Sequence, residues 1–126
     1  MRRVREPSAA SRSPSIRRVA AFGPAHRVPL MGMALPSADA FETPLGKVPL
    51  DRAAIQRIAS LPGVTIADEP HRLEHCLEVQ LPFLQRRLGD FTLIPVVVGD
   101  APPTQVAAVV DDLAQIPGTL FLISSD

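Results

Sequence analysis

The stretch that decides the fold is VAAFGPAHRVPL, Val19–Leu30. Its first four residues are all apolar, which is typical of a strand buried on both faces of a parallel sheet. Gly23 and Pro24 end the apolar run by turn chemistry, so His26 follows in the loop just beyond the strand. Ligands of open α/β sheets bind at this carboxyl edge. His26 is therefore a candidate site residue, and the alternative is an ordinary histidine that packs a surface loop.

Downstream of this strand, runs with strand character alternate with runs at helical spacing. Asp51 and Thr104 stand where helix N-caps belong. Pro82 should kink or split a helix, and Pro95 suggests an edge strand or a bulge. The alternation predicts an α/β fold with a mixed, mostly parallel sheet and flanking helices. The expected strands cover residues 31–35, 64–66, 91–98 and 119–123, and the expected helices cover residues 52–61, 71–88 and 105–116.

Length and charge limit the domain organisation and the kinds of partner. The 126 residues suffice for one domain. Residues 1–18 hold six arginines against one acid and are expected to form a disordered Arg/Ser-rich arm. The body, residues 19–126, has seven basic and twelve acidic residues, a net charge of −5, which argues against a nucleic-acid-binding face. Cys76 is the only cysteine and no run approaches transmembrane length, so we expect a cytoplasmic protein that does not enter membranes.

Several side chains have the chemistry of metal ligands. His26, His75, Glu74 and Asp126 are ligand types for Fe(II) or Zn(II), and two histidines with one carboxylate would leave coordination positions open. His26 and Asp126 both follow the ends of expected strands. If those strands are neighbours in the sheet, the two side chains can converge at its carboxyl edge.

A competing interpretation rests on HRLEH, residues 71–75. It matches H-x-x-E-H, in which two histidines one helical turn apart hold zinc and the glutamate acts as general base. His71 and His75 would be the ligands of such a metallopeptidase, and Glu74 its base. The match is only five residues long, and no glutamate after Glu78 offers a third ligand. The alternative is that His71 only begins the helix and that Glu74 and Glu78 solvate its outer face.

Four landmarks in a fixed order carry a family resemblance. They are GPAHRVPL (23–30), EHCLEVQLPFL (74–84), IPVVVG (94–99) and SSD (124–126). Together they resemble the Memo family, whose bacterial and archaeal members are called AmmeMemoRadiSam system protein B. The resemblance covers residues 18–126 and implies an α/β fold similar to the class III extradiol dioxygenases, with a metal-type pocket at the carboxyl edge of the sheet.

The resemblance also implies roles for individual residues. His26 and Asp126 fall on metal-binding positions of the family, and Asp126 and His75 are expected to be catalytic. The metal would be iron, copper or zinc, in a pocket related to dioxygenases and other oxidoreductases. Cys76 stands where the family usually has serine. The family's upstream P-H-A-G-Y type motif and everything after S-S-D have no counterpart here. We therefore expect residues 19–126 to form a partial domain that binds metal weakly or not at all and is inactive.

The resemblance leaves a second kind of function open. Memo-like proteins are also linked with phosphopeptide-type partners, which would make the chain a non-catalytic interaction module. His26 and Arg27 could contact an anion, but no arginine cluster supports phosphate recognition. The expected partners are thus an unknown small molecule or protein. Self-association is expected too, because a partial domain exposes sheet edges.

Overall fold

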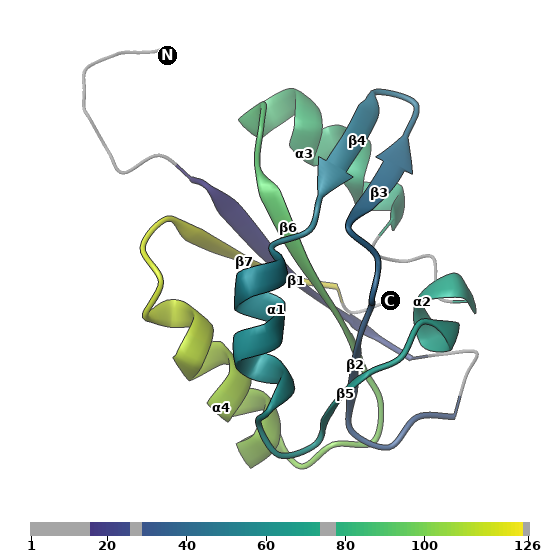
Figure 1. Cartoon of the computed structure of the whole chain (residues 1–126), viewed down its shortest axis with the longest axis vertical. Helices are drawn as coiled ribbons and strands as arrows, with labels where there is room; N and C mark the ends of the chain where they lie inside the picture. The colour runs from purple at the N-terminus through teal and green to yellow at the C-terminus, as the bar shows by residue number, and fades with distance from the viewer. Residues whose placement is uncertain (1–15, 26–28, 74–77, 125–126) are drawn as a thin grey trace.

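The computed structural model describes residues 16–25, 29–73 and 78–124. Within these residues a five-stranded sheet has the order β5-β2-β6-β1-β7 (Figure 1). Three of its strand pairs are parallel, and β2 pairs antiparallel with β6. The predicted α/β fold with a mixed, mostly parallel sheet is therefore confirmed. The strands are β1 (Arg18–Pro24), β2 (Met33–Leu35), β5 (Val64–Ile66), β6 (Thr92–Val98) and β7 (Thr119–Ile123).

Helices and a hairpin flank this sheet. The strands β3 (Ala40–Thr43) and β4 (Gly46–Pro49) form an antiparallel hairpin in a region for which the sequence predicted no strand. Figure 1 shows the hairpin beside α3, and Thr43 Oγ1 donates to Gln85 Oε1 of α3 at 2.6 Å. The helices are α1 (Arg52–Ala59), α2 (Glu69–Leu73), α3 (Leu81–Leu88) and α4 (Pro103–Ala114), and the short 3₁₀ helix η1 spans Glu78–Gln80.

The predicted helix after Asp51 is confirmed together with its cap. Asp51 Oδ1 accepts a hydrogen bond from the N–H of Ala54 at 3.1 Å, which satisfies one of the free donors of the first turn. Figure 1 shows α1 and α4 side by side, and the Arg57 Nε of α1 lies 2.9 Å from Asp112 Oδ2 of α4. Both helices bury an apolar stripe in the core, comprising Ala54, Ile55 and Ile58 from α1 and Val109 and Leu113 from α4.

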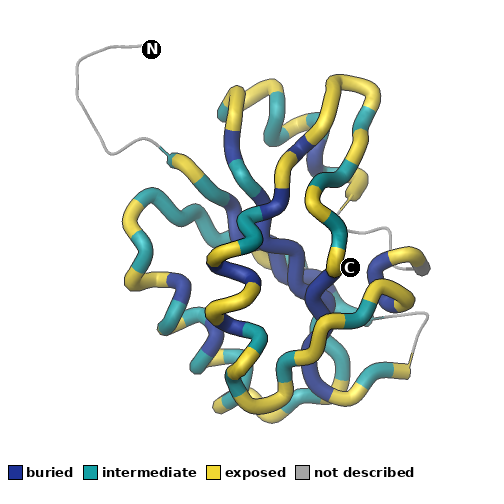
Figure 2. The backbone as a smooth tube through the Cα atoms, viewed as in Figure 1, coloured by how far each residue is buried: buried dark blue, intermediate teal, exposed yellow. Residues whose placement is uncertain are grey.

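The centre of the core is formed by β1 and β6. Both strands have five consecutive buried residues between half-buried ends, as expected for strands covered on both faces. Figure 2 shows the buried residues gathered along these central strands, and the exposed ones on the hairpin and the outer sides of the helices. β1 begins at Arg18, a residue that we had assigned to the N-terminal arm. Its guanidinium Nε lies 2.9 Å from Asp51 Oδ2.

Pro95 does not mark an edge or a bulge, so that prediction is wrong. It lies in β6 between β1 and β2, opposite Ala21 of β1. Leu93 O accepts from Asp51 N, and Gly99 N donates to Gly32 O, both on the side away from β1. The backbone groups of residues two apart point to the same side of a strand, so the N–H that Pro95 lacks would also face that side. There the ladder with β2 begins only at Val97, so no pairing partner is lost.

The prediction that Pro82 splits a helix is confirmed, and one cap prediction needs correction. Within the predicted helix 71–88, the 3₁₀ helix η1 is followed by α3 from Leu81, and Pro82 lies in the first turn of α3, where a missing N–H costs nothing. The N-cap of α4 is Pro102, and Thr104 already lies inside the helix, with no side-chain cap. In the part of the chain that the structure describes, no helix is long and apolar enough to cross a membrane.

Candidate functional site at the carboxyl edge

The carboxyl ends of β1, β6 and β7 meet at one edge of the sheet. β1 lies between the other two strands and runs parallel to both. The register pairs Phe22 with Ile123 and Pro24 with Val98. The N–H of Ser124 continues the ladder beyond β7 and donates to Phe22 O at 2.8 Å. The segments that follow β1 and β7 therefore leave the sheet side by side, as the metal-site hypothesis requires.

The predicted site residues themselves lie outside the described residues. His26 falls in the gap 26–28, His75 in the gap 74–77 and Asp126 in residues 125–126. Among the residues that are described, no three or more His, Cys, Asp or Glu side chains are grouped so as to hold a metal ion. The structure thus brings together the strand ends that carry His26 and Asp126, and the ligand set stays a prediction.

A predominantly apolar hollow lies at the same edge. Its volume is about 330 Å³. Phe22 and Pro24 line it from β1, Val98 from β6, Val106 from α4 and Ile123 from β7. The resemblance implied a pocket at this edge, but its apolar lining could not be predicted from the sequence, because the walls come from four separate elements. A cavity of this kind at the carboxyl edge of an α/β sheet is a typical place for the apolar part of a ligand.

His71 is buried and holds α2 to the sheet. The residue is 7% exposed, and its Nε2 lies 2.8 Å from the carbonyl oxygen of Ala34 in β2. A carbonyl only accepts, so Nε2 carries the proton. Burial lowers the pKa of His71 below its ordinary value of 6.5, opposed by the Ala34 hydrogen bond and by Asp68. His71 is therefore not a residue of a solvated helix face.

This contact also weakens the metallopeptidase interpretation. H-x-x-E-H requires both histidines on one continuous helix, directed at the same ion. The Nε2 atom of His71 is already engaged by the carbonyl oxygen of Ala34, and Glu74 and His75 lie outside the described residues. A protonated, hydrogen-bonded nitrogen cannot bind zinc, which needs the lone pair. The geometry of His71 thus speaks for a structural role.

The start of α2 is fixed by Asp68. Ser37 donates to both carboxylate oxygens of Asp68, from its N–H at 2.8 Å and from its hydroxyl at 2.6 Å. These two hydrogen bonds lower the pKa of Asp68 below its ordinary value of 3.8. A shallow hollow of about 260 Å³ between this helix and Phe41 is lined by Asp68 and His71. Both side chains already have partners, so we assign this hollow no chemistry.

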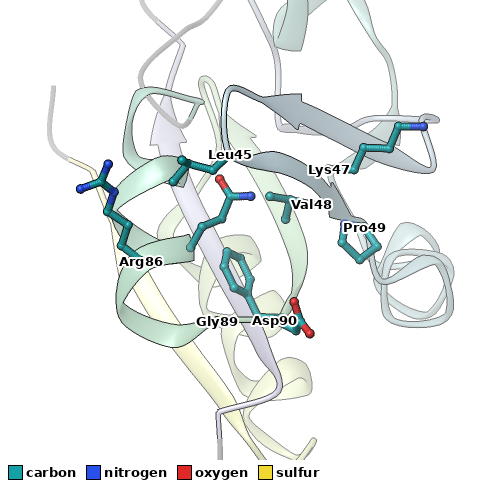
Figure 3. A pocket seen from close by; sticks show the side chains of 9 residues that line it. Leu45, Lys47, Val48, Pro49, Arg86, Gly89 and Asp90 are labelled. Atoms are coloured by element: carbon teal, nitrogen blue, oxygen red, sulfur yellow. The ribbon is translucent and has the colours of Figure 1, made fainter.

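Another hollow, of about 300 Å³, lies between the β3–β4 hairpin and α3 (Figure 3). Its lining includes Lys47, Arg86 and Asp90. Figure 3 shows the side chains of Lys47 and Arg86 pointing away from one another, so they do not converge on a common anion. The hollow is a seam between the hairpin and the helix and not a second candidate site.

Comparison with known proteins agrees with the landmarks in the sequence. The sequence model of the family described as Memo-like protein matches residues 8–126. The chain belongs to the Memo family. The match begins inside the segment for which we expected an arm. The α/β sheet described above is consistent with the class III extradiol dioxygenase-like fold that this membership implies.

Individual relatives give the extent of the similarity. The chain is 32% identical over 120 residues to the protein memo-1 homolog of Caenorhabditis elegans, and the matched region covers 90% of this chain and 34% of that protein. It is 43% identical over 75 residues to a MEMO1 family protein of Thermotoga neapolitana, covering 59% and 26%. For a MEMO1 family protein of Thermoplasma volcanium the identity is 31% over 118 residues, covering 92% and 44%. The chain thus spans less than half of the length of these relatives.

Proposed function

We propose that the carboxyl edge of β1 and β7 is a metal-binding edge, in a pocket related to those of the extradiol dioxygenases. Its protein ligands are His26, which follows β1, and Asp126, which follows β7. The observation that supports this proposal is the parallel pairing of β1 with β7 in the register Phe22 to Ile123. That register starts both ligand-bearing segments at the same level of the sheet.

The donor set suits a divalent transition metal. A neutral imidazole and a carboxylate are common ligands of iron and zinc, and copper is the third candidate. A bound ion would supply Lewis-acid or redox chemistry at this edge. His26 would bind through an unprotonated ring nitrogen, so binding should weaken as the pH falls through the pKa of this histidine.

His75 is the proposed proton carrier. A histidine titrates close to neutral pH, so it can take up and return a proton at a reacting group. Asp126 adds a negative charge at the edge, which favours a cation and a protonated imidazole nearby. The adjoining apolar hollow, walled by Phe22 and Val106, would exclude water from the apolar side of a ligand.

Two ligands are fewer than the roughly three protein ligands of catalytic metal sites. We therefore propose weak metal binding and no turnover by this chain on its own. The activity of the longer relatives remains a proposal for this chain as well, since it spans 26–44% of their length.

Metal titration tests the proposal. Zn²⁺ and anaerobic Fe²⁺ would be titrated calorimetrically into the wild-type chain, His26→Ala and His71→Ala. We expect one ion per chain in the wild type, loss of binding in His26→Ala, and retention in His71→Ala. Loss in His71→Ala with retention in His26→Ala would instead favour the metallopeptidase interpretation. Equal binding in all three would remove His26 from the site.

Self-association is a second proposal about this chain. β7 forms one edge of the described sheet, contains no charged residue, and leaves Ile123 68% exposed. Uncharged apolar edges are templates for pairing with another chain. Light scattering after size exclusion should show oligomers that Ile123→Lys reduces, and a strictly monomeric wild type would contradict this.

A further inference from the structure

The carboxyl end of β6 holds both flanks of the segment that contains His26. On one side the N–H of Ala25 donates to Val98 O at 2.9 Å. On the other side the N–H of Asp100 donates to Leu30 O at 2.7 Å. The acceptor Val98 O and the donor Asp100 N–H are only two residues apart in the chain. Ala25 and Leu30, which flank the segment that contains His26, are therefore held at nearly the same place on the sheet.

Gly99 lies in the middle of this stretch and has no room for a side chain. A Cβ atom on Gly99 would lie 2.6 Å from the Cβ and 2.8 Å from the carbonyl carbon of Leu30, and closer still to the Leu30 oxygen. The obstacle is mainly backbone, which cannot rotate away as a flexible side chain can. The N–H of Gly99 meanwhile donates to Gly32 O at 2.8 Å. Gly99 is thus packed between two points of the loop that follows His26.

We propose that Gly99 is a positioning residue for the metal-binding edge. By lacking a Cβ, it lets Leu30 approach closely enough to bond Asp100, and this bond fixes the point to which the His26 segment returns. The inference rests on the proposed function, because it assigns Gly99 its effect through His26.

The contact sets geometry more than it stabilises the core. The loop on the far side of Gly99 is largely solvated, since Pro29 is exposed and Met31 is 77% exposed. Little apolar surface is therefore buried by seating this loop on β6, and hydrophobic stabilisation scales with that surface. What the hydrogen bonds of Ala25 and Asp100 provide is a fixed location for the backbone on each side of His26.

Zinc titration of two glycine variants tests the inference. Gly99→Ala should bind Zn²⁺ roughly 10- to 100-fold more weakly than wild type, as when a group that orients a metal ligand is lost. Gly46→Ala is the matched control. Its φ of 123° makes the substitution strained, but a Cβ there meets nothing within 4 Å. It should lower the melting temperature and leave zinc affinity unchanged. Wild-type affinity in Gly99→Ala, or an equal loss in both variants, would overturn the assignment.

Amide hydrogen exchange separates this inference from the proposed function. If the wild type and His26→Ala both fail to bind zinc, the metal site is wrong, but the anchoring can still be measured by NMR. The Asp100 amide should then exchange faster in Gly99→Ala and at the wild-type rate in Gly46→Ala. Unchanged protection of Asp100 in Gly99→Ala would overturn the positioning role. If Gly99→Ala does not fold, Asp100→Pro removes the same N–H donor without a Cβ at residue 99, and the same zinc expectation applies.

Discussion

Replacing His71 with alanine should destabilise the chain by about 2 kcal/mol at neutral pH. About 1 kcal/mol of this comes from the hydrogen bond between His71 Nε2 and Ala34 O, at 2.8 Å. About 1 kcal/mol more comes from the ring contact with Phe41, whose centroid lies 6.4 Å away at an angle of 53°. The loss should appear as a weaker attachment of α2 to β2.

The size of this effect should depend on pH. Because burial lowers the pKa of His71 in the folded state, the unfolded chain binds a proton at residue 71 more readily than the folded chain. The free energy of unfolding of the wild type therefore falls as the pH drops below about 6.5. The total loss is about 1.4 kcal/mol for each unit by which the pKa of His71 is lowered. His71→Ala lacks this titration, so its deficit should shrink between pH 7.5 and pH 5.

Urea unfolding followed by circular dichroism at the two pH values measures both quantities, since the chain has no Trp or Tyr for fluorescence. His26 and His75 are present in wild type and variant alike, so the difference isolates residue 71. Ile58→Val provides a control whose deficit should be the same at both pH values. A His71→Ala deficit that stays constant, or grows at pH 5, would show that the ring is not held neutral and refute the argument.

Three smaller effects follow from other contacts. Asp51→Ala removes the cap of α1 and the partner of Arg18 and should cost about 1 to 2 kcal/mol in urea unfolding, whereas exposed Asp111→Ala should stay within about 0.5 kcal/mol. Ile58→Ala leaves a cavity in the core and should cost about 2 to 5 kcal/mol by the same measurement. Ser37→Ala should raise the pKa of Asp68 part of the way toward 3.8, as followed by NMR titration, because it removes the hydroxyl hydrogen bond that favours the charged carboxylate and leaves the backbone N–H of residue 37 in place.

The elements that could be predicted from sequence are those whose signal is local. β1, β6 and β7 are near-continuous apolar runs, and α1 has an N-cap followed by a helical stripe, so each was recognisable from its own residues. The hairpin was not, because β3 and β4 are four residues each and have no strong apolar alternation. The hydrogen bond that joins the hairpin to α3 connects Thr43 and Gln85, which are 42 residues apart in the sequence.

His71 shows why the candidate site was harder to predict than the fold. The expected helix 71–88 put His71 and Glu78 on the same element. In the structure His71 lies buried in α2, and Glu78 lies in the 3₁₀ helix η1. The burial of His71 is decided by Ala34, a partner 37 residues away, and no local pattern reports such a contact. The glycine at residue 99 was likewise visible only as the end of a strand.

The position of the proposed metal-binding edge is determined by the packing of the core. β1 and β6 keep one register over seven pairs, from Arg18 with Thr92 to Pro24 with Val98, and the bond from Ala25 to Val98 is the next step of that ladder. A slip of one residue would turn every buried side chain of β1 to the opposite face, which the packing on both sides forbids. The place where the chain leaves β1 at Ala25 is therefore set by the burial of the strands and not by the loop that follows. It follows that metal affinity should be lost with the global unfolding of β1 and β6, except where a change at Gly99 releases the loop alone.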